Sequence, residues 1–111
     1  METRILKTLS QWFPEAFADV KKSELVSDYR TLLHFAKYTL KLINENSESK
    51  KEPFKIILLL YSKGSLYEKN AIENEFLKVL SDEENAMKLK EHLDLMPENL
   101  KPVYLKTIVE N

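Results

Sequence analysis

Turn-forming residues are scarce in this chain, which has one glycine (Gly64) and four prolines among its 111 residues. A β-sandwich or β-barrel needs a turn about every ten residues, and glycine often supplies the tight ones. The scarcity therefore argues against a many-stranded fold and favours long helices joined by few loops. A content of 43% hydrophobic and 32% charged residues fits one soluble domain, so we expect residues 1–111 to form a single helical domain.

The apolar residues repeat with the period of an α-helix in every well-patterned segment. The longest pattern covers residues 23–44 and carries two apolar strips. A helix with two such strips contacts more than one neighbour, so we expect it to lie centrally. Shorter patterns predict helices over residues 2–13, 66–80, 82–93 and 100–109, and Pro53 suits the first turn of another. The predicted fold is all-α, a single compact bundle of five to six helices.

Three local signals refine these boundaries. The apolar run at residues 56–61 could form a buried strand or a helix, and we favour a helix because no partner strand is visible. Gly64 follows this run, where helices often end with a residue in the left-handed conformation. Residues 65–68 and 81–84 both have the Ser-x-x-Glu spacing of a capping box, which predicts two further helix starts.

The aromatic residues Trp12, Phe13 and Phe17 fit two positions in such a bundle. They could complete the core, or they could form an exposed patch through which two copies associate. The sequence does not separate these alternatives, so the oligomeric state stays open.

Composition argues against several classes of function. The chain has 17 basic and 18 acidic side chains and a pI near 6.1, so no overall attraction to nucleic acid or to an anionic membrane is expected. The absence of cysteine rules out disulfides and thiolate chemistry and suits a reducing compartment. The start lacks a secretion signal, and the longest apolar run, at 56–61, is far shorter than the roughly 20 residues of a membrane span. We therefore expect a cytoplasmic protein.

No feature of the sequence points to catalysis. A single glycine leaves no phosphate-binding loop, and neither a Gly-x-Ser-x-Gly nor a His-Glu-x-x-His motif occurs. The two histidines, His34 and His92, are expected on the solvated faces of their helices. The sequence therefore predicts no catalytic residue, no metal site and no cofactor.

Acidic side chains concentrate in residues 65–98, which contain nine acidic and four basic residues. An acidic surface favours a basic protein partner, because opposite charges steer association. We define the predicted acidic flank as Glu68, Glu73, Glu75, Asp82, Glu83 and Glu84. Asn70 and Asn74 lie one turn apart on the same helix, where asparagine is unfavourable. We expect their amides to bond to a neighbouring segment, with ligand binding as the alternative.

A basic strip lies on the long helix. Its members recur at steps of four, three and four residues and therefore share one side: Arg30, His34, Lys37 and Lys41. Such a strip suits phosphate contacts, which makes a nucleic-acid or regulator accessory domain the alternative function. The leading hypothesis is a non-catalytic protein-binding module that uses the acidic flank, because few of the basic residues are arginine, the residue that recognises phosphate best.

The C-terminal part of the chain resembles a known family. Residues 70–77 contain Asn-x-x-x-Asn-x-Phe-Leu, and residues 96–100 contain Met-Pro-x-x-Leu, followed by Tyr104. Both features are similar to those of a family of small bacterial all-helical domains of unknown function, in which leucine precedes the proline. The resemblance implies a bacterial source and an all-helical domain, and it implies no activity. Small helical proteins of this kind are sometimes immunity proteins beside toxins, which makes an immunity-like role one form of the leading hypothesis.

Overall fold

The computed structural model describes residues 3–25, 27–82 and 86–110. Within these ranges it contains six helices and no strand, which confirms the predicted all-α bundle. The fourth helix changes from α to π and back to α, so it carries three labels. The elements are α1 (Arg4–Trp12), η1 (Pro14–Ala16), η2 (Lys22–Glu24), α2 (Asp28–Asn44), α3 (Glu52–Ser62), α4 (Leu66–Ala71), η3 (Ile72–Leu77), α5 (Lys78–Ser81), α6 (Ala86–Leu95) and α7 (Lys101–Glu110).

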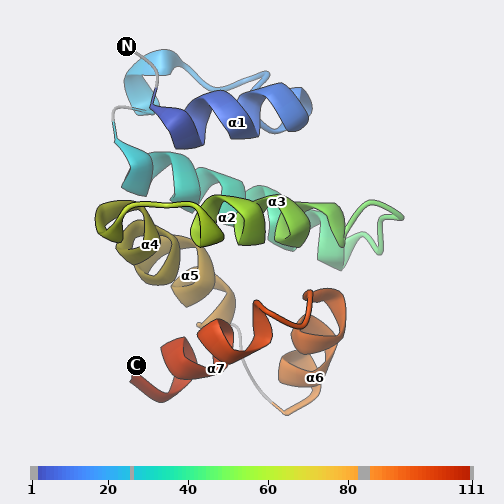
Figure 1. Cartoon of the computed structure of the whole chain (residues 1–111). Coiled ribbons are helices and arrows are strands. Elements are labelled where there is room, and N and C mark those ends of the chain that lie inside the picture. Colours follow the sequence, from blue (N-terminus) through green and yellow to red (C-terminus); the bar gives the residue numbers. More distant parts are fainter. Residues whose placement is uncertain (1–2, 26, 83–85, 111) are drawn as a thin grey trace.

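The helices are arranged around α2. In Figure 1, α1 lies at one end of the molecule, α2 and α3 occupy the middle, and α6 and α7 lie at the other end. The continuous helix α4–η3–α5 runs from the middle toward α7, and α2 contacts α1 and all three parts of it. The central position expected for the long helix is therefore confirmed.

Two N-caps decide where the first long helices begin. The Thr3 hydroxyl accepts the Leu6 N–H at 3.2 Å, so α1 begins at Arg4. The Ser27 hydroxyl accepts the Arg30 N–H at 3.2 Å, so α2 begins five residues later than predicted. The residues before it form the separate 3-10 turn η2 instead. Pro14 follows the end of α1, and the chain enters η1 there.

The apolar run at 56–61 lies inside α3, which confirms the helix assignment. The expected left-handed conformation of Gly64 is wrong, because its φ is not positive. Among the described residues the positive φ belongs to Asn46, at 52°, just beyond the end of α2. A Cβ atom at position 64 would lie 2.8 Å from the Leu60 carbonyl oxygen, so space and not backbone conformation requires the glycine.

The capping box at Ser65 is present: its hydroxyl accepts the Glu68 N–H, and the Glu68 carboxylate accepts the Ser65 N–H. The second predicted box is wrong at its first residue. Ser81 is the last residue of α5, and its hydroxyl donates to the Lys78 carbonyl at 2.8 Å. The following helix, α6, is described from Ala86 onward, and Glu84 lies outside the described residues.

An aromatic cluster at the middle of the core joins α2 and η3 to the two residues that flank η1. Phe35 of α2 has its ring centroid 5.1 Å from that of Phe13, 6.3 Å from that of Phe17 and 5.8 Å from that of Phe76 in η3. Phe13 and Phe17 therefore belong with the core, whereas Trp12 is 61% exposed. Two of the three N-terminal aromatic residues thus take the predicted core position, and Trp12 does not.

The position expected for His92 is wrong. The side chain is buried, with 1% exposure, and its Nδ1 lies 3.2 Å from the Tyr104 hydroxyl. Tyr104 is fully buried as well, so the pair joins α6 to α7. Local spacing assigned His92 to solvent because the covering helix, α7, follows later in the chain.

Candidate binding site

A hollow of about 240 Å³ lies between α2 and the segment that leads through η2. It is lined by Val20, Glu24, Leu25, Arg30, Leu33, His34 and Lys37. Three of these residues belong to the predicted basic strip, and the fourth strip residue, Lys41, is exposed one turn beyond the lining. The sequence does not predict the wall formed by Val20, Glu24 and Leu25, because these residues lie in or beside η2, a short turn without a periodic pattern.

The two sides of the hollow present different chemistry. Arg30, His34 and Lys37 lie at steps of four and three residues on α2, so they line up on one side of that helix. Val20 and Leu25 come from either side of η2 and supply apolar wall. The site therefore combines cationic groups with apolar surface.

His34 is less solvated than the sequence predicts. Its Nε2 lies 2.7 Å from the Ala16 carbonyl oxygen, and its ring centroid lies 5.5 Å from that of Phe17. A carbonyl oxygen accepts only, so the Nε2 atom carries a hydrogen and donates it. This hydrogen bond holds the His34 ring, on α2, against Ala16 of η1 at the side of the hollow.

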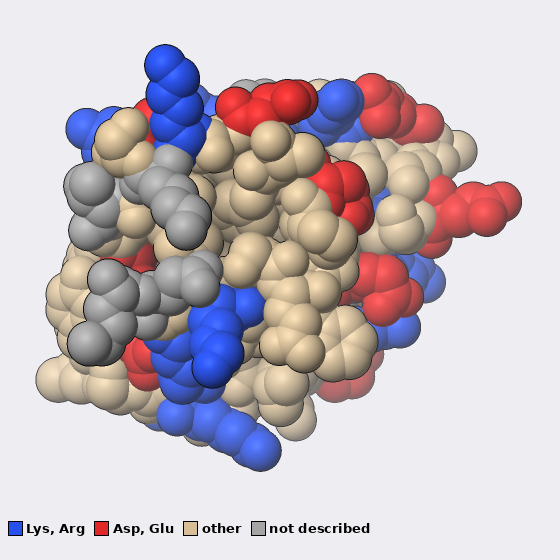
Figure 2. Space-filling model, turned by 90° about the horizontal axis from the view of Figure 1, so that it is seen from above, with Lys and Arg blue, Asp and Glu red and all other residues tan. Residues whose placement is uncertain are grey.

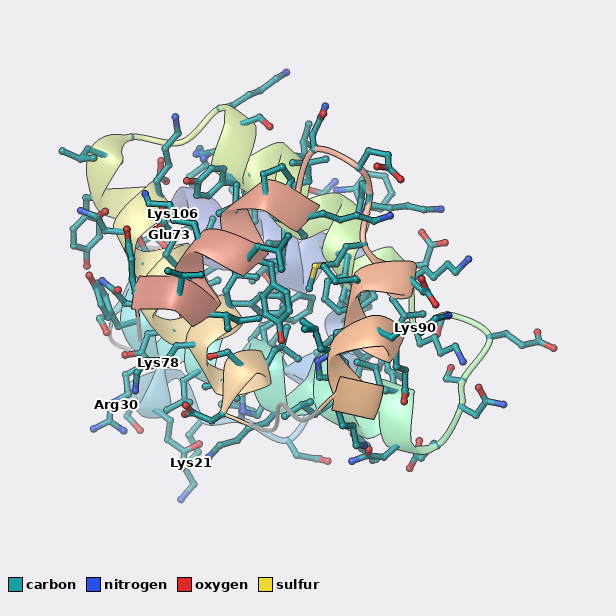
Figure 3. All side chains as sticks on the ribbon, turned by 90° about the horizontal axis from the view of Figure 1, so that it is seen from below. Lys21, Arg30, Glu73, Lys78, Lys90 and Lys106 are labelled. Carbon is teal, nitrogen blue, oxygen red and sulfur yellow. The ribbon has the colours of Figure 1, made fainter. Side chains whose placement is uncertain are left out.

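Arg30 and Lys37 are the two cations in the lining of the hollow. Within the described part of the chain, neither the Arg30 guanidinium nor the Lys37 ammonium forms an ion pair or a side-chain hydrogen bond. Figure 3 shows Arg30 of α2 and Lys21, the residue before η2, projecting at the same corner of the molecule. The other arginine, Arg4, donates hydrogen bonds to Glu68 and to the Leu60 carbonyl. Arg30 is therefore available to an anionic ligand.

The acidic flank is partly occupied by contacts within the chain. The Arg4 guanidinium donates to both carboxylate oxygens of Glu68, at 3.1 and 3.2 Å, and to the Leu60 carbonyl at 3.0 Å. These hydrogen bonds, followed by the one from the Ser65 N–H, hold the pKa of Glu68 below its usual range. Glu68 thus joins α1 to the turn between α3 and α4.

Glu73 is engaged as well. Its Oε2 accepts the Tyr61 hydroxyl at 2.7 Å, and its Oε1 lies 3.8 Å from the Lys106 ammonium (Figure 3). Partial burial and the bond to the Glu73 carboxylate raise the pKa of Tyr61 to about 12. Glu75 is half-buried and Asp82 is exposed at the end of α5, whereas Glu83 and Glu84 lie outside the described residues.

The asparagine pair has the opposite environment from the one predicted. Asn70 and Asn74 are both exposed, and in the described ranges neither amide forms a hydrogen bond. The expected bonding to a neighbouring segment is therefore wrong. Asn74 lies in the π-helical segment η3, whose wider turn places this residue outward.

The remaining surface has mixed charge. Figure 2 shows the face above α1, where side chains of both signs are spread around a largely uncharged centre.

None of the helices within the described ranges has the length and apolar character that crossing a bilayer requires. The described residues also contain no group of three or more histidine, aspartate or glutamate side chains suited to a metal ion.

Comparison with known proteins gives one match. Residues 6–110 match a family described as a domain of unknown function, DUF7674. No curated protein and no solved structure matches the chain. The family match extends well beyond the C-terminal motifs that carry the resemblance in the sequence and covers α1 to α7 almost completely. The chain therefore belongs to the DUF7674 family of domains of unknown function.

Proposed function

We propose that this domain is a non-catalytic protein-binding module that docks an acidic segment of a partner protein in the hollow on α2. The observation that carries the proposal is the free Arg30 guanidinium beside His34 and Lys37 at a partly apolar hollow. An arginine that lacks a partner can donate two parallel hydrogen bonds to one carboxylate, which adds geometry to charge attraction. The lack of cysteine suits a reducing compartment such as the cytoplasm, which is part of the proposal.

Three features favour a peptide over a nucleic acid. Val20, Leu25 and Leu33 give the hollow apolar wall, which suits the side chain of an apolar residue next to a carboxylate. Glu24 in the same lining offsets one of the two positive charges of Arg30 and Lys37, so the charge of the hollow suits a single carboxylate better than a run of phosphates. The whole chain also carries a net charge of −1, whereas a nucleic-acid surface is normally strongly basic.

The hollow is also a better docking surface than the acidic flank. Glu68 and Glu73 already form hydrogen bonds to Arg4 and Tyr61, so binding a basic partner through them would break contacts within the bundle. Arg30 and Lys37 form no ion pair within the described residues, so an acidic partner could bind them without breaking one. The basic strip, which was the alternative in the sequence, thus becomes the docking site of the module.

The test uses a fluorescent peptide built from aspartate, glutamate and leucine as the probe, with anisotropy as the readout. We expect Arg30→Glu with Lys37→Glu to weaken binding by about tenfold or more, because two attractive charges become repulsive. Added salt should weaken binding to the wild type and have little effect on the double variant.

The matched control reverses two charges on the acidic flank, Glu75→Lys with Asp82→Lys. This control should bind the peptide at least as well as the wild type. The proposal fails if the wild type does not bind the peptide at low salt, or if the Arg30/Lys37 variant binds as tightly as the wild type. Binding of single-stranded DNA in place of the peptide would favour the nucleic-acid function instead.

A further inference from the structure

We propose that the partner segment continues from the hollow across α4 and η3 as an extended chain, and that the side-chain amides of Asn70 and Asn74 bind its backbone. The inference rests on the proposed function and adds the conformation of the partner to it. The carrying observation is a pair of exposed asparagines, one helical turn apart, whose amides form no hydrogen bond within the described residues.

An asparagine amide matches the backbone of an extended chain. Its oxygen accepts a hydrogen bond and its nitrogen donates one, so it can pair with the N–H and the C=O of a single residue. In an extended chain these two groups point to the same edge, and every second residue presents them there. Asparagine disfavours helices, and the two amides give the bundle no hydrogen bond in return, so their chemistry is available to a partner.

The spacing of the two amides fits this repeat. Four residues of an α-helix rise about 6 Å, and two residues of an extended chain span about 6.6 Å. Asn74 lies in the π-helical segment, whose wider turn brings it more nearly in line with Asn70 than an α-helix would. One extended segment can therefore bond to both amides through residues two positions apart. Single π-helical turns of this kind recur at functional sites.

A continuous surface joins the amides to the hollow. Leu33 lines the hollow, and Tyr29 lies one turn before it on the same side of α2. The Tyr29 ring centroid lies 5.8 Å from that of Tyr67, which is 54% exposed on α4. Tyr67 precedes Asn70 by three residues, so the two share one side of their helix. The path from the hollow to the amides thus runs over two tyrosine rings, which suit contact with peptide side chains.

The experiment compares two peptides by anisotropy. The short one is the peptide of aspartate, glutamate and leucine, and the long one adds about six residues of alternating threonine and valine at each end, which favour an extended chain. The wild type should bind the long peptide about tenfold more tightly, because several hydrogen bonds of small net value outweigh the ordering of the added chain. This gain should persist at high salt, because amides carry no charge.

The test variant is Asn70→Ala with Asn74→Ala. It should bind both peptides with the affinity that the wild type has for the short one, and its melting temperature should not fall, because alanine favours helices. The matched control, Gln11→Ala, removes an exposed amide from α1 and should keep the gain. In the wild type, the side-chain amide NMR signals of both asparagines should shift with the long peptide and not with the short one.

The outcomes separate the two proposals. Equal affinities of the wild type for the two peptides overturn the extended segment and leave the docking site in the hollow standing. A gain that survives in the double variant overturns it as well, because the added chain would then bind elsewhere. A lower melting temperature of the double variant would assign the amides to the bundle instead of a partner. Failure of the wild type to bind either peptide overturns the docking site and the inference that rests on it.

Discussion

Single side chains in this bundle take their roles from residues far away in the chain. Gly64 lies so close to the Leu60 carbonyl that a side chain would collide with it, and the Arg4 guanidinium donates to the same carbonyl oxygen. The sequence correctly marks Gly64 as special, but a local rule assigns the wrong cause. The true cause is the closeness of the Leu60 carbonyl oxygen, four residues earlier, which depends on how α3 ends and not on a preference of the residue type.

We predict that Gly64→Ala lowers the stability of the domain by about 1–2 kcal/mol. The added methyl group must displace the backbone of α3, while the smaller freedom of alanine in the unfolded chain offsets part of this loss. Thermal unfolding followed by circular dichroism measures the change. Ser62→Ala, at an exposed position two residues earlier, is the control and should leave the melting temperature almost unchanged. Equal melting temperatures of Gly64→Ala and wild type would contradict the crowding at Leu60.

At the scale of elements, periodicity predicts helices well and their contacts poorly. The steps of α2 correctly place Arg30, His34 and Lys37 on one side, and these residues do line one hollow. The opposite wall comes from η2, a short turn without a periodic pattern, so the sequence could not show that a hollow exists. The run at 56–61 has the same difficulty, because six consecutive apolar residues do not reveal which of them faces water.

We predict unequal effects for two neighbouring leucines of α3. Leu60 is 1% exposed and Leu59 is 47% exposed. Leu60→Ala should therefore cost about 2–5 kcal/mol through the cavity it leaves, whereas Leu59→Ala should change the stability by about 0.5 kcal/mol or less. Urea unfolding of both variants is the measurement, and each serves as the control of the other. Similar losses in the two variants would mean that α3 is rotated about its axis.

At the scale of the whole molecule, contacts between distant segments decide which charges are free. The sum of charges over residues 65–98 is a property of the sequence, but the use of Glu68 and Glu73 by Arg4 and Tyr61 is a property of the fold. The acidic flank predicted from composition is thus partly engaged in contacts within the chain, whereas Arg30 and Lys37 of the basic strip form no ion pair within the described residues. Arg4 and Glu68 are separated by 64 positions, so their bond also fastens the start of the chain to the bundle.

This bond makes stability depend on pH in a defined direction. The pKa of Glu68 is lowered in the folded protein, chiefly by Arg4, so its contribution is present above about pH 4.3, the ordinary value for glutamate, and is lost as the pH falls through the folded value. We predict that Arg4→Met destabilises the domain most near pH 7 and that its difference from wild type shrinks below pH 4. A smaller loss, due to the Leu60 carbonyl, should persist.

Urea midpoints between pH 7 and pH 3 measure that difference. The control is Lys55→Met, which removes an exposed pair with Glu52 and should have little effect at any pH. A gap between Arg4→Met and wild type that is the same at pH 3 as at pH 7 would show that the charge of Glu68 contributes nothing.

The π-helical segment η3 makes the continuous helix α4–η3–α5 tolerant to the loss of one residue. Three buried side chains, Ile72, Phe76 and Leu80, follow each other at steps of four residues. In an α-helix each such step overshoots a full turn by about 40°, and the wider π turn absorbs this excess. A chain without the exposed Asn74 would have steps of three and four and would point the same three side chains inward with ordinary α turns. The helix therefore holds one residue more than its inner face requires, and the deletion of one residue at this point would leave the rest of the bundle in register.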